Sequence, residues 1–550
     1  MDAEEIELGD TQKKMDTEAA ENGIDLEGPE IISIHPKQDS LRFFAPGASY
    51  NLHKYIIKCK NAPYIDVADA RIFPFNGDVT IFKNAVLDTL RKSWISANTV
   101  TKYHRINNTT TNIFGRRNYL ASGEYEYKDE NDKSFLINFK IIKPDTSGQT
   151  ISEGDIPEKE NFRFNDYFSF AGKVFLKAAD EFLTFDGGTK IVHNCNKIGK
   201  SYLKFSGEIN PNEILIPIPK KALDMKGLEV GTGLFFNSDS NSVYPAFLSL
   251  QGARSSKNVI EADGLLTFNR ETKEYEISNK EKLDEKSLPG NYVGLDTKNC
   301  MINSEGSYNL INDLGQVKLT SIGNANYNSV TDSVNFNLML VVDFFFESSL
   351  IRKMAKDLEL YIGALTPVPL EGNLFTHGII ELLGKERGDK ALSDLNLYGN
   401  YKKFPDELEK PLVFNNVKMT YNKNTKSYLS EGMLGLGNIL KTEIFRYMNG
   451  VIQIKKQRGG DALDIYLEAD ANTWYYFNYY KGTMLAFSNN SEFNRGIEGL
   501  KSKNKKMNVE KGPSYKFDLG NKRKKDLFLE KLKQFGAYGV EEDKEKKQEE

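Results

Sequence analysis

The sequence predicts a mainly β protein, in which a repetitive β-solenoid or a series of stacked β modules is followed by a smaller α+β domain with an antiparallel meander. Short apolar runs with a period of two recur between residues 31 and 346, separated by Gly, Asn and Asp. Aromatic residues, which strands favour, include 34 Phe and 27 Tyr. A helical pattern follows this region, and strand patterns return from about Pro411.

The composition also predicts how the chain is divided. A chain of 550 residues is expected to form about three or four folding units. The first 30 residues hold eleven acidic side chains against Lys13 and Lys14, which is typical of a solvated tail. The expected segments are a disordered acidic tail (1–30), a repetitive β region with room for two or more modules (31–346), a helical segment (347–410), an antiparallel β-meander that packs with the helical segment (411–495) and a charged tail (496–550).

Two internal similarities indicate that β units repeat. Residues 73–81 and 168–176 share an aromatic pair, a Gly and an alternating strand pattern. Residues 268–275 and 421–428 share polar turn residues between strand residues, as a hairpin requires. A repeat that cannot bury its apolar face alone has to pack on the next one, which favours stacked modules. Chance similarity among ordinary hairpins is the alternative explanation.

The helical segment contains two helix patterns. The first can be capped by Ser348 and Ser349, and it places three apolar residues on one face, Leu350, Met354 and Leu358. The second runs from about residue 374 to Gly384, and residues 389–395 can extend it.

Turn signals predict the meander that follows. Asn449-Gly450 is a type I′ hairpin signal, and Lys481-Gly482 separates two apolar strands as a second hairpin. In the charged tail, a short surface helix is expected around Leu527. Docking of this helix to a partner or to anionic lipid headgroups is the alternative to a purely solvated role.

The charge and the apolar runs exclude several kinds of protein. The formal net charge of −4 gives no overall field that would attract nucleic acid. The longest apolar stretch, residues 336–346, is too short to cross a bilayer as a helix and predicts a buried strand. The start of the chain is acidic where a secretory signal needs a basic residue and an apolar core. Either the protein is not exported, or Met1 is not the true start of a longer product.

Cysteine and histidine are sparse. Cys59, Cys195 and Cys300 are far apart and form no CxxC pair, so neither a disulfide framework nor a zinc site is expected. His193 and Cys195 would share one side of a strand, which could form a metal pair or a thiolate with its base. The simpler interpretation, which we favour, is that both pack inside a β layer. We expect no metal and no cofactor.

Asp66 and Asp69 raise the question of carbohydrate chemistry, because some sugar-cleaving solenoid enzymes gather carboxylates on one face of their strands. Their spacing places them on opposite faces of a regular strand, so a turn-forming Asp is the favoured interpretation. The sequence contains no complete phosphate-binding loop and no GxSxG motif. These observations favour a protein that is not an enzyme.

Residues 474–480 form the densest aromatic string of the chain. In a strand, Trp474 and Tyr476 would share one side and Tyr479 would lie on the other. Exposed aromatic rings could stack on sugars or on another protein, so these three residues are the candidate binding residues. The alternative is that one face is core and the other is covered by a neighbouring element.

Three stretches carry a resemblance to a known group of proteins: Val67-Ala68-Asp69-Ala70, Gly172-Lys173-Val174-Phe175-Leu176-Lys177-Ala178 and His193-Asn194-Cys195. With the Lys-, Asn- and Tyr-rich style of the chain, they resemble the C-terminal part of large uncharacterised β-rich, solenoid-like envelope proteins of Bacteroidetes. The resemblance covers most of residues 31–500. It implies a structural or assembly role near the secretion or gliding machinery, with other envelope proteins as partners, and it supplies no catalytic residues.

The leading hypothesis is therefore a non-catalytic scaffold or binding protein of the cell envelope. A fragment of a longer exported protein would lie in the periplasm or at the outer membrane, and otherwise the chain would be cytoplasmic. One alternative is a carbohydrate-binding or carbohydrate-active β-solenoid protein, with glycan as its partner. The other is a phage or secretion-fibre component.

Overall fold

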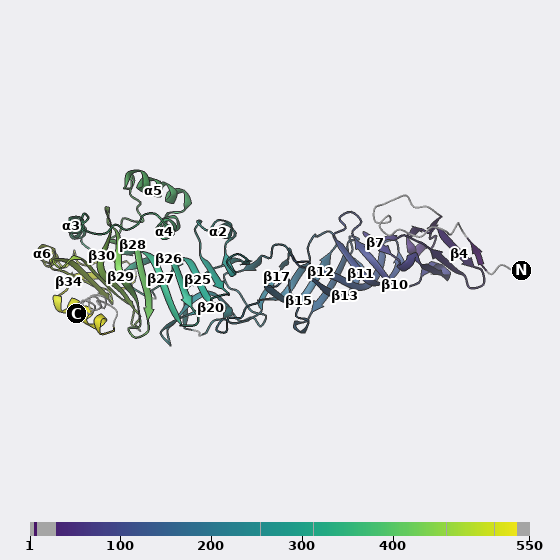
Figure 1. Ribbon diagram of the computed structural model, residues 1–550, viewed down its shortest axis with the longest axis horizontal. Helices are drawn as coiled ribbons and strands as arrows, with labels where there is room; N and C mark the ends of the chain where they lie inside the picture. Colours follow the sequence, from purple (N-terminus) through teal and green to yellow (C-terminus); the bar gives the residue numbers. More distant parts are fainter. Residues whose placement is uncertain are drawn as a thin grey trace, which may run out of the picture. The chain divides into compact units, whose positions relative to one another are not determined.

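The computed structural model is mainly β, as the sequence predicts, and it describes residues 5–7, 29–252, 255–311, 313–457, 459–510 and 512–535 (Figure 1). Nearly all of the expected acidic tail, residues 1–30, lies outside these ranges. The chain divides into two compact units. Unit 1 runs to His193 and includes Tyr202–Ile216 and Leu223–Gly227, and unit 2 comprises Asn194–Ser201, Pro217–Ala222 and Leu228–Glu550.

Unit 1 is built from a five-stranded sheet, a two-stranded sheet and a ten-stranded antiparallel meander. The small sheets contain β1 (Glu5–Glu7), β4 (Gly47–Asn51), β5 (Ile56–Lys60), β8 (Val79–Phe82) and β9 (Val86–Leu87), and β2 (Glu30–Ile32) with β3 (Arg42–Phe44). The large sheet contains β6 (Ile65–Val67), β7 (Ala70–Phe73), β10 (Leu90–Ala97), β11 (His104–Gly115), β12 (Asn118–Lys128), β13 (Ser134–Pro144), β14 (Thr150–Ile156), β15 (Phe168–Lys177), β16 (Thr184–Ile191) and β17 (Leu203–Glu208).

Unit 2 is organised around a fourteen-stranded sheet whose strands follow one another in sequence order after the edge strand β18. Its strands are β18 (Ile216–Ile218), β22 (Gly264–Asn269), β23 (Glu274–Ser278), β24 (Tyr292–Asp296), β25 (Met301–Tyr308), β26 (Lys318–Asn328), β27 (Ser333–Asp343), β28 (Leu412–Asn422), β29 (Ser427–Ile439), β30 (Thr442–Lys455), β31 (Ala462–Asp470), β32 (Thr473–Tyr480), β33 (Thr483–Ser488) and β34 (Lys516–Leu519). A three-stranded sheet contains β20 (Ser242–Leu250), β19 (Val230–Asn237) and β21 (Ser256–Glu261).

Helices of unit 2 are inserted into this strand sequence (Figure 1). They are α2 (Lys280–Asp284), α3 (Ser348–Glu359), α4 (Asn373–Leu383), α5 (Lys385–Tyr398), α6 (Ser491–Gly499) and α7 (Lys522–Gln534). In the part of the chain that is described, no helix combines the length and apolar character that crossing a bilayer requires.

A β-solenoid is not confirmed. The neighbours in the ten-stranded sheet and those from β22 to β33 in the fourteen-stranded sheet all pair antiparallel, whereas β33 and β34 pair in parallel. Consecutive strands are joined mainly by tight turns, as in a meander, whereas the coils of a parallel β-helix stack in parallel.

The first internal similarity is not a structural repeat. β7 ends at Phe73, and Phe75–Gly77 forms a 3-10 turn in which Gly77 has a φ of 69°. The matching residues 168–176 lie within the continuous strand β15. Pro74 explains the difference, because it has no N–H to donate to a sheet, whereas Ser169 at the equivalent position continues the strand.

The second similarity is confirmed as a recurring hairpin turn. The side-chain oxygens of Asn269 and Asn422 each accept hydrogen bonds from the backbone N–H groups two and three residues further on. Lys273 and Lys426 close these turns with left-handed φ values of 60° and 52°. The same side-chain contacts occur at five further hairpins, which begin at Asn51, Asn98, Asn237, Asp296 and Asn328. The repeated pattern therefore reflects one turn type.

The predicted buried face of the first helix is confirmed, whereas the residues at which the helices begin and end differ from the prediction. Leu350, Met354 and Leu358 of α3 are buried on one side as expected. The cap is Glu347 and not Ser348 or Ser349, since its carboxylate accepts from the N–H of Ser349 at 3.4 Å. α5 does not extend α4, because Gly384 interrupts the helix with a φ of 81°.

One of the two predicted hairpins in the meander is wrong. Asn449 and Gly450 lie inside β30 and pair with Glu468 and Leu467 of β31. The chain turns at residues 440–441, where Leu440 has a φ of 49°. Gly is needed at position 450 because a Cβ there would collide with a carbonyl oxygen of β31. The Lys481-Gly482 hairpin is confirmed, with φ values of 47° and 76°.

Residues 496–535, which we expected in a charged tail, contribute the end of α6, all of β34 and α7. Tyr515 and Phe517 anchor the segment, with 2% and 0% of their surface exposed. Their rings lie near that of Phe345, at centroid distances of 6.1 Å and 5.9 Å. A few well-placed aromatic residues thus fix a segment that is otherwise dominated by charge.

Candidate functional site

The aromatic string lies in β32, and the three candidate binding residues are buried. Trp474, Tyr476 and Tyr479 are 8%, 4% and 2% exposed. Helix α7 covers the side that carries Trp474 and Tyr476, where Leu532 belongs to the same apolar cluster and the Phe528 ring lies 5.6 Å from that of Tyr476. A ligand cannot reach the Trp474 and Tyr476 rings while α7 occupies this position, and the Tyr479 ring on the other side stacks on Tyr515 at 6.0 Å. Binding by these residues remains a prediction, which requires α7 to move away from Trp474 and Tyr476 and Tyr515 to move away from Tyr479.

The opposite side of β32 is also covered. The Tyr475 hydroxyl donates to Asp357 of α3 at 2.5 Å, and its ring lies 5.2 Å from Phe493 of α6. Phe477 lies 5.6 Å from Phe344 and 6.0 Å from Phe346. The string forms a core between two layers because both faces of the strand meet apolar partners.

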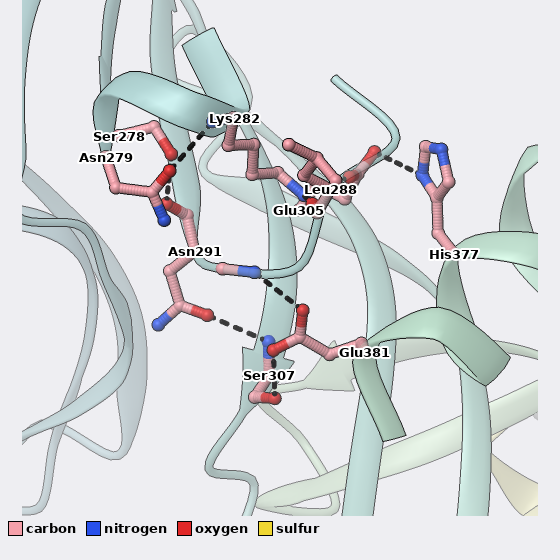
Figure 2. Close-up of polar contacts among 10 residues, drawn as sticks. Ser278, Asn279, Lys282, Leu288, Asn291, Glu305, Ser307, His377 and Glu381 are labelled. Carbon is pink, nitrogen blue, oxygen red and sulfur yellow. Dashed lines mark hydrogen bonds and ion pairs between the residues drawn. The ribbon is translucent and has the colours of Figure 1, made fainter. Parts of the chain in front are cut away.

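Three ionisable side chains from α2, β25 and α4, one buried and two partly buried, contact one another in a chain (Figure 2). The Lys282 ammonium of α2 lies 2.7 Å from one oxygen of Glu305 in β25, and His377 Nδ1 of α4 lies 3.0 Å from the other. Their side chains are 4%, 24% and 17% exposed, respectively. The Lys282 ammonium also donates to the Leu288 carbonyl at 3.0 Å. One carboxylate thus connects two helices to the sheet.

Local structure positions these groups. The Asn279 side chain caps the first turn of α2 by accepting from the Lys282 N–H at 2.8 Å, which orients the short helix over β25. On α4, Glu381 follows His377 by one turn and faces the same region. Glu381 accepts from the Gly290 N–H at 2.7 Å and from the Ser307 hydroxyl at 3.2 Å (Figure 2). Two contacts therefore hold α4 to the loop after α2 and to β25.

The Glu305 carboxylate is held in its ionised form. Burial alone raises its pKa, but hydrogen bonds from His377 and Lys282 and the charge of Lys282 outweigh burial and lower the pKa below 4.5. A carboxylate that orients an imidazole also occurs in acid–base catalysis. Here the hydroxyl of Ser307, also on β25, donates to Glu381. The arrangement is suited to docking α4 and to making that contact sensitive to acid.

Sequence reasoning did not identify these residues. Lys282, Glu305 and His377 are separated by 23 and 72 positions, and only the fold brings them together. A partial signal was present in the four-residue spacing of His377 and Glu381 on a predicted helix. That spacing indicates a shared face but not what the face contacts.

The two carboxylates proposed for carbohydrate chemistry have separate structural roles. Asp66 forms a two-point ion pair with Arg71, at 2.8 Å and 3.1 Å. Asp69 lies in the turn between β6 and β7 and accepts from the Thr150 N–H at 2.9 Å and from its hydroxyl at 2.5 Å. The preference for a turn-forming Asp is confirmed for Asp69. The contacts give no acid and nucleophile pair.

The expectation of no disulfide was wrong. Cys195 and Cys300 are bonded, although 105 residues separate them in sequence. Spacing could not reveal the pair, because the partner lies at the end of the hairpin that begins at Asp296. Cys195 has no thiolate or metal-binding role beside His193 while it is bonded, and neither residue lies in a strand.

Cys59 is a buried free thiol whose pKa is raised to about 11 by burial.

A broad hollow lies on one face of the large sheet of unit 1. Its volume is about 1050 Å³, and residues of β13, β14 and β15 line most of it. Ile141 is 54% exposed there, and Ile151 and Phe175 are half-buried. Lys143, Lys177 and Glu153 also line the hollow, so apolar side chains and both signs of charge share one open surface.

No protein-family model matches the chain, and neither a curated protein nor a solved structure does so.

Proposed function

We propose that this chain is a non-catalytic scaffold or binding protein of the bacterial cell envelope. The hollow on β13–β15 is the observation that supports binding most directly. A meander buries one face in its core, and the other face carries exposed Ile141 beside half-buried Phe175. Apolar side chains gathered on an open, concave face are typical of a surface that meets a partner.

The disulfide supports the proposed compartment. Cys195–Cys300 is an intramolecular bond between distant parts of unit 2. Such bonds persist in oxidising compartments such as the periplasm and are rare where thioredoxin keeps thiols reduced. This argument is independent of the resemblance to envelope proteins of Bacteroidetes.

The contacts of the ionisable groups favour a role without catalysis. The Lys282, Glu305 and His377 chain docks two helices, and Asp66 is neutralised by Arg71. We also propose that the β units are stacked in series and so offer an extended surface to partners. The sequence-ordered meander within each large sheet supports it.

Capture of partners from the native membrane fraction tests binding at the hollow. The variant Ile141→Asp with Phe175→Ser should recover partners about tenfold less well than the wild type, because it removes apolar contact and adds a charge. Val100→Asp is the matched control, since Val100 is an exposed apolar residue of unit 1, at 87%, outside the hollow. Equal recovery by both variants would remove the hollow as the binding surface.

Cell fractionation tests the compartment separately. We expect the chain in the envelope fraction with Cys195 and Cys300 unreactive toward alkylation until a reductant is added. A cytosolic chain with reduced thiols would contradict the proposal.

The alternatives, a carbohydrate-binding or carbohydrate-active protein and a phage or secretion-fibre component, stay predictions. A glycan array with a hydrolase screen tests the first, and the gene neighbourhood tests the second.

A further inference from the structure

Helix α7 carries a dense set of cations on a protein that is close to neutral. Residues 501–533 contain twelve basic and four acidic residues, whereas the whole chain has a formal net charge of −4. The apolar side of α7 holds it on the large sheet of unit 2 through Phe528, Leu529 and Leu532. The remaining sides of the helix face solvent, and most of the basic residues are there.

The outward face of α7 combines cations with apolar side chains. Arg523, Leu527 and Lys531 are four residues apart and therefore share one face. Arg523 and Lys531 are exposed, and Leu527 between them is 54% exposed. Phe535, at the end of the helix, is 42% exposed. Apolar residues flanked by cations on one helical face are typical of helices that lie at a lipid surface.

Lys455 of β30 interacts electrostatically with Lys531 of α7. Burial lowers the pKa of Lys455 in β30, and the neighbouring Lys531 ammonium lowers it further. Among the described residues, neither ammonium forms an ion pair. Other lysines nearby are neutralised, since Lys505 lies 2.9 Å from Asp518 and Lys525 lies 2.8 Å from Asp526. Lys455 and Lys531 therefore repel each other, and the charge of Asp464 offsets only part of the effect on Lys455.

We propose that the exposed face of α7, together with Lys455, binds the phosphate-bearing surface of an anionic lipid membrane. The Lys455 and Lys531 ammonium groups bind lipid phosphates, while Leu527 and Phe535 insert between headgroups. Exposed Leu527 at the centre of the face favours lipid over nucleic acid, whose backbone would meet only the cations. The inference deepens the proposed function and rests on it, because an envelope protein meets anionic lipid.

Sedimentation of the full chain with vesicles tests this surface. We expect binding to vesicles of phosphatidylcholine mixed with phosphatidylglycerol, little binding to phosphatidylcholine alone, and weaker binding as salt is added. The variant Lys455→Gln with Lys531→Gln should weaken binding by about fivefold for each charge removed. Leu527→Ser should also weaken binding, with the salt dependence unchanged, because it removes an apolar contact and no charge.

The control is Lys298→Gln with Lys418→Gln, which removes the same charge from two exposed lysines of unit 2 outside α7. It should bind as the wild type does. The proposal is overturned if anionic and neutral vesicles bind equally, or if the control loses as much binding as the test variant. It is also overturned if duplex DNA binds at this face and Leu527→Ser has no effect on vesicles.

Folding and compartment are checked independently of this result. Removing both repelling charges in the Lys455→Gln with Lys531→Gln variant should leave the circular dichroism unchanged and the unfolding midpoint unchanged or slightly raised, so loss of binding would not reflect loss of structure. If the chain binds anionic vesicles but fractionates with the cytosol, the lipid-binding proposal stands and the envelope role is contradicted. A chain that fractionates with the envelope but does not bind anionic vesicles would contradict the lipid-binding surface and leave the envelope role in place.

Discussion

The large sheet of unit 1 is an antiparallel meander and that of unit 2 is antiparallel from β22 to β33, yet the two sheets differ in how many of their faces are buried. Along β14 of unit 1, buried residues alternate with exposed or half-buried ones. The first six residues of β31 in unit 2 are all buried. The alternating strand has one core face and one open face, whereas the uniformly buried strand is covered on both.

Inserted helices account for the difference. Unit 2 places three helices between β27 and β28 and two more around β34, and these cover parts of both sheet faces. In the ten-stranded sheet of unit 1, successive strands are connected without α-helices in the described residues. One face of that sheet therefore remains available, and the hollow at β13–β15 lies on it. Covering a face increases stability, whereas leaving it open provides a binding surface.

The largest expected effect is the loss of a ring from the doubly covered sheet. Phe477→Ala should lower the free energy of unfolding of unit 2 by about 3–5 kcal/mol, because Phe477 is 1% exposed and the cavity cannot close. The two tryptophans make the measurement specific, since Trp94 lies in unit 1 and Trp474 in unit 2. Denaturant unfolding is followed by Trp474 fluorescence in a Trp94→Phe background. A loss below 1 kcal/mol would mean that the covered face is loosely packed.

The disulfide should contribute somewhat less to the free energy of unfolding of unit 2 than the Phe477 ring does. Cys195→Ala with Cys300→Ala is expected to destabilise unit 2 by about 2–4 kcal/mol, since the bond closes a long loop in the unfolded chain. A reductant should shift the wild type by a similar amount and leave the double variant unchanged. The Trp94 signal should not move in either experiment. A reductant effect on the double variant would assign the change to something other than this bond.

Acid should act on unit 2 through Glu305. Because its folded pKa lies below the usual 4.5, its contribution is complete above that pH and is lost as the pH falls through the folded value. Glu305→Gln should cost about 1.5–3 kcal/mol at neutral pH, the range for hydrogen bonds to charged groups. The variant should also show a flatter decline of stability below pH 4.5. Parallel acid profiles for variant and wild type would contradict this assignment.

The smallest effect is expected on the open face of unit 1. Phe114 in β11 is 51% exposed, so Phe114→Ala should change the unfolding free energy by at most about 0.5 kcal/mol. The same fluorescence measurement, with Trp94 as the reporter in a Trp474→Phe background, provides the test. A change as large as that of Phe477→Ala would mean that this ring has a partner in solution and that the face is not open.

Much of the fold could be predicted because it depends on local patterns. The Asn269 and Asn422 hairpins follow from side-chain oxygens that bond to the next backbone N–H groups. The buried face of α3 follows from the spacing of Leu350, Met354 and Leu358. The Asn449-Gly450 prediction failed because a turn dipeptide can also serve a close approach between strands, and Gly450 does so against β31. Local propensity cannot distinguish these two uses of Gly.

The sequence by itself determined that this chain is mainly β, that Asn269 and Asn422 begin hairpin turns, and that Leu350, Met354 and Leu358 share a buried face of α3, because each depends on residues within a few positions of one another. Only the tertiary structure decided which sheet face is covered, that Cys195 meets Cys300, and that Lys282, Glu305 and His377 form one network. These features join residues far apart in the chain. Their energies depend on burial and partner distance, which no local pattern specifies.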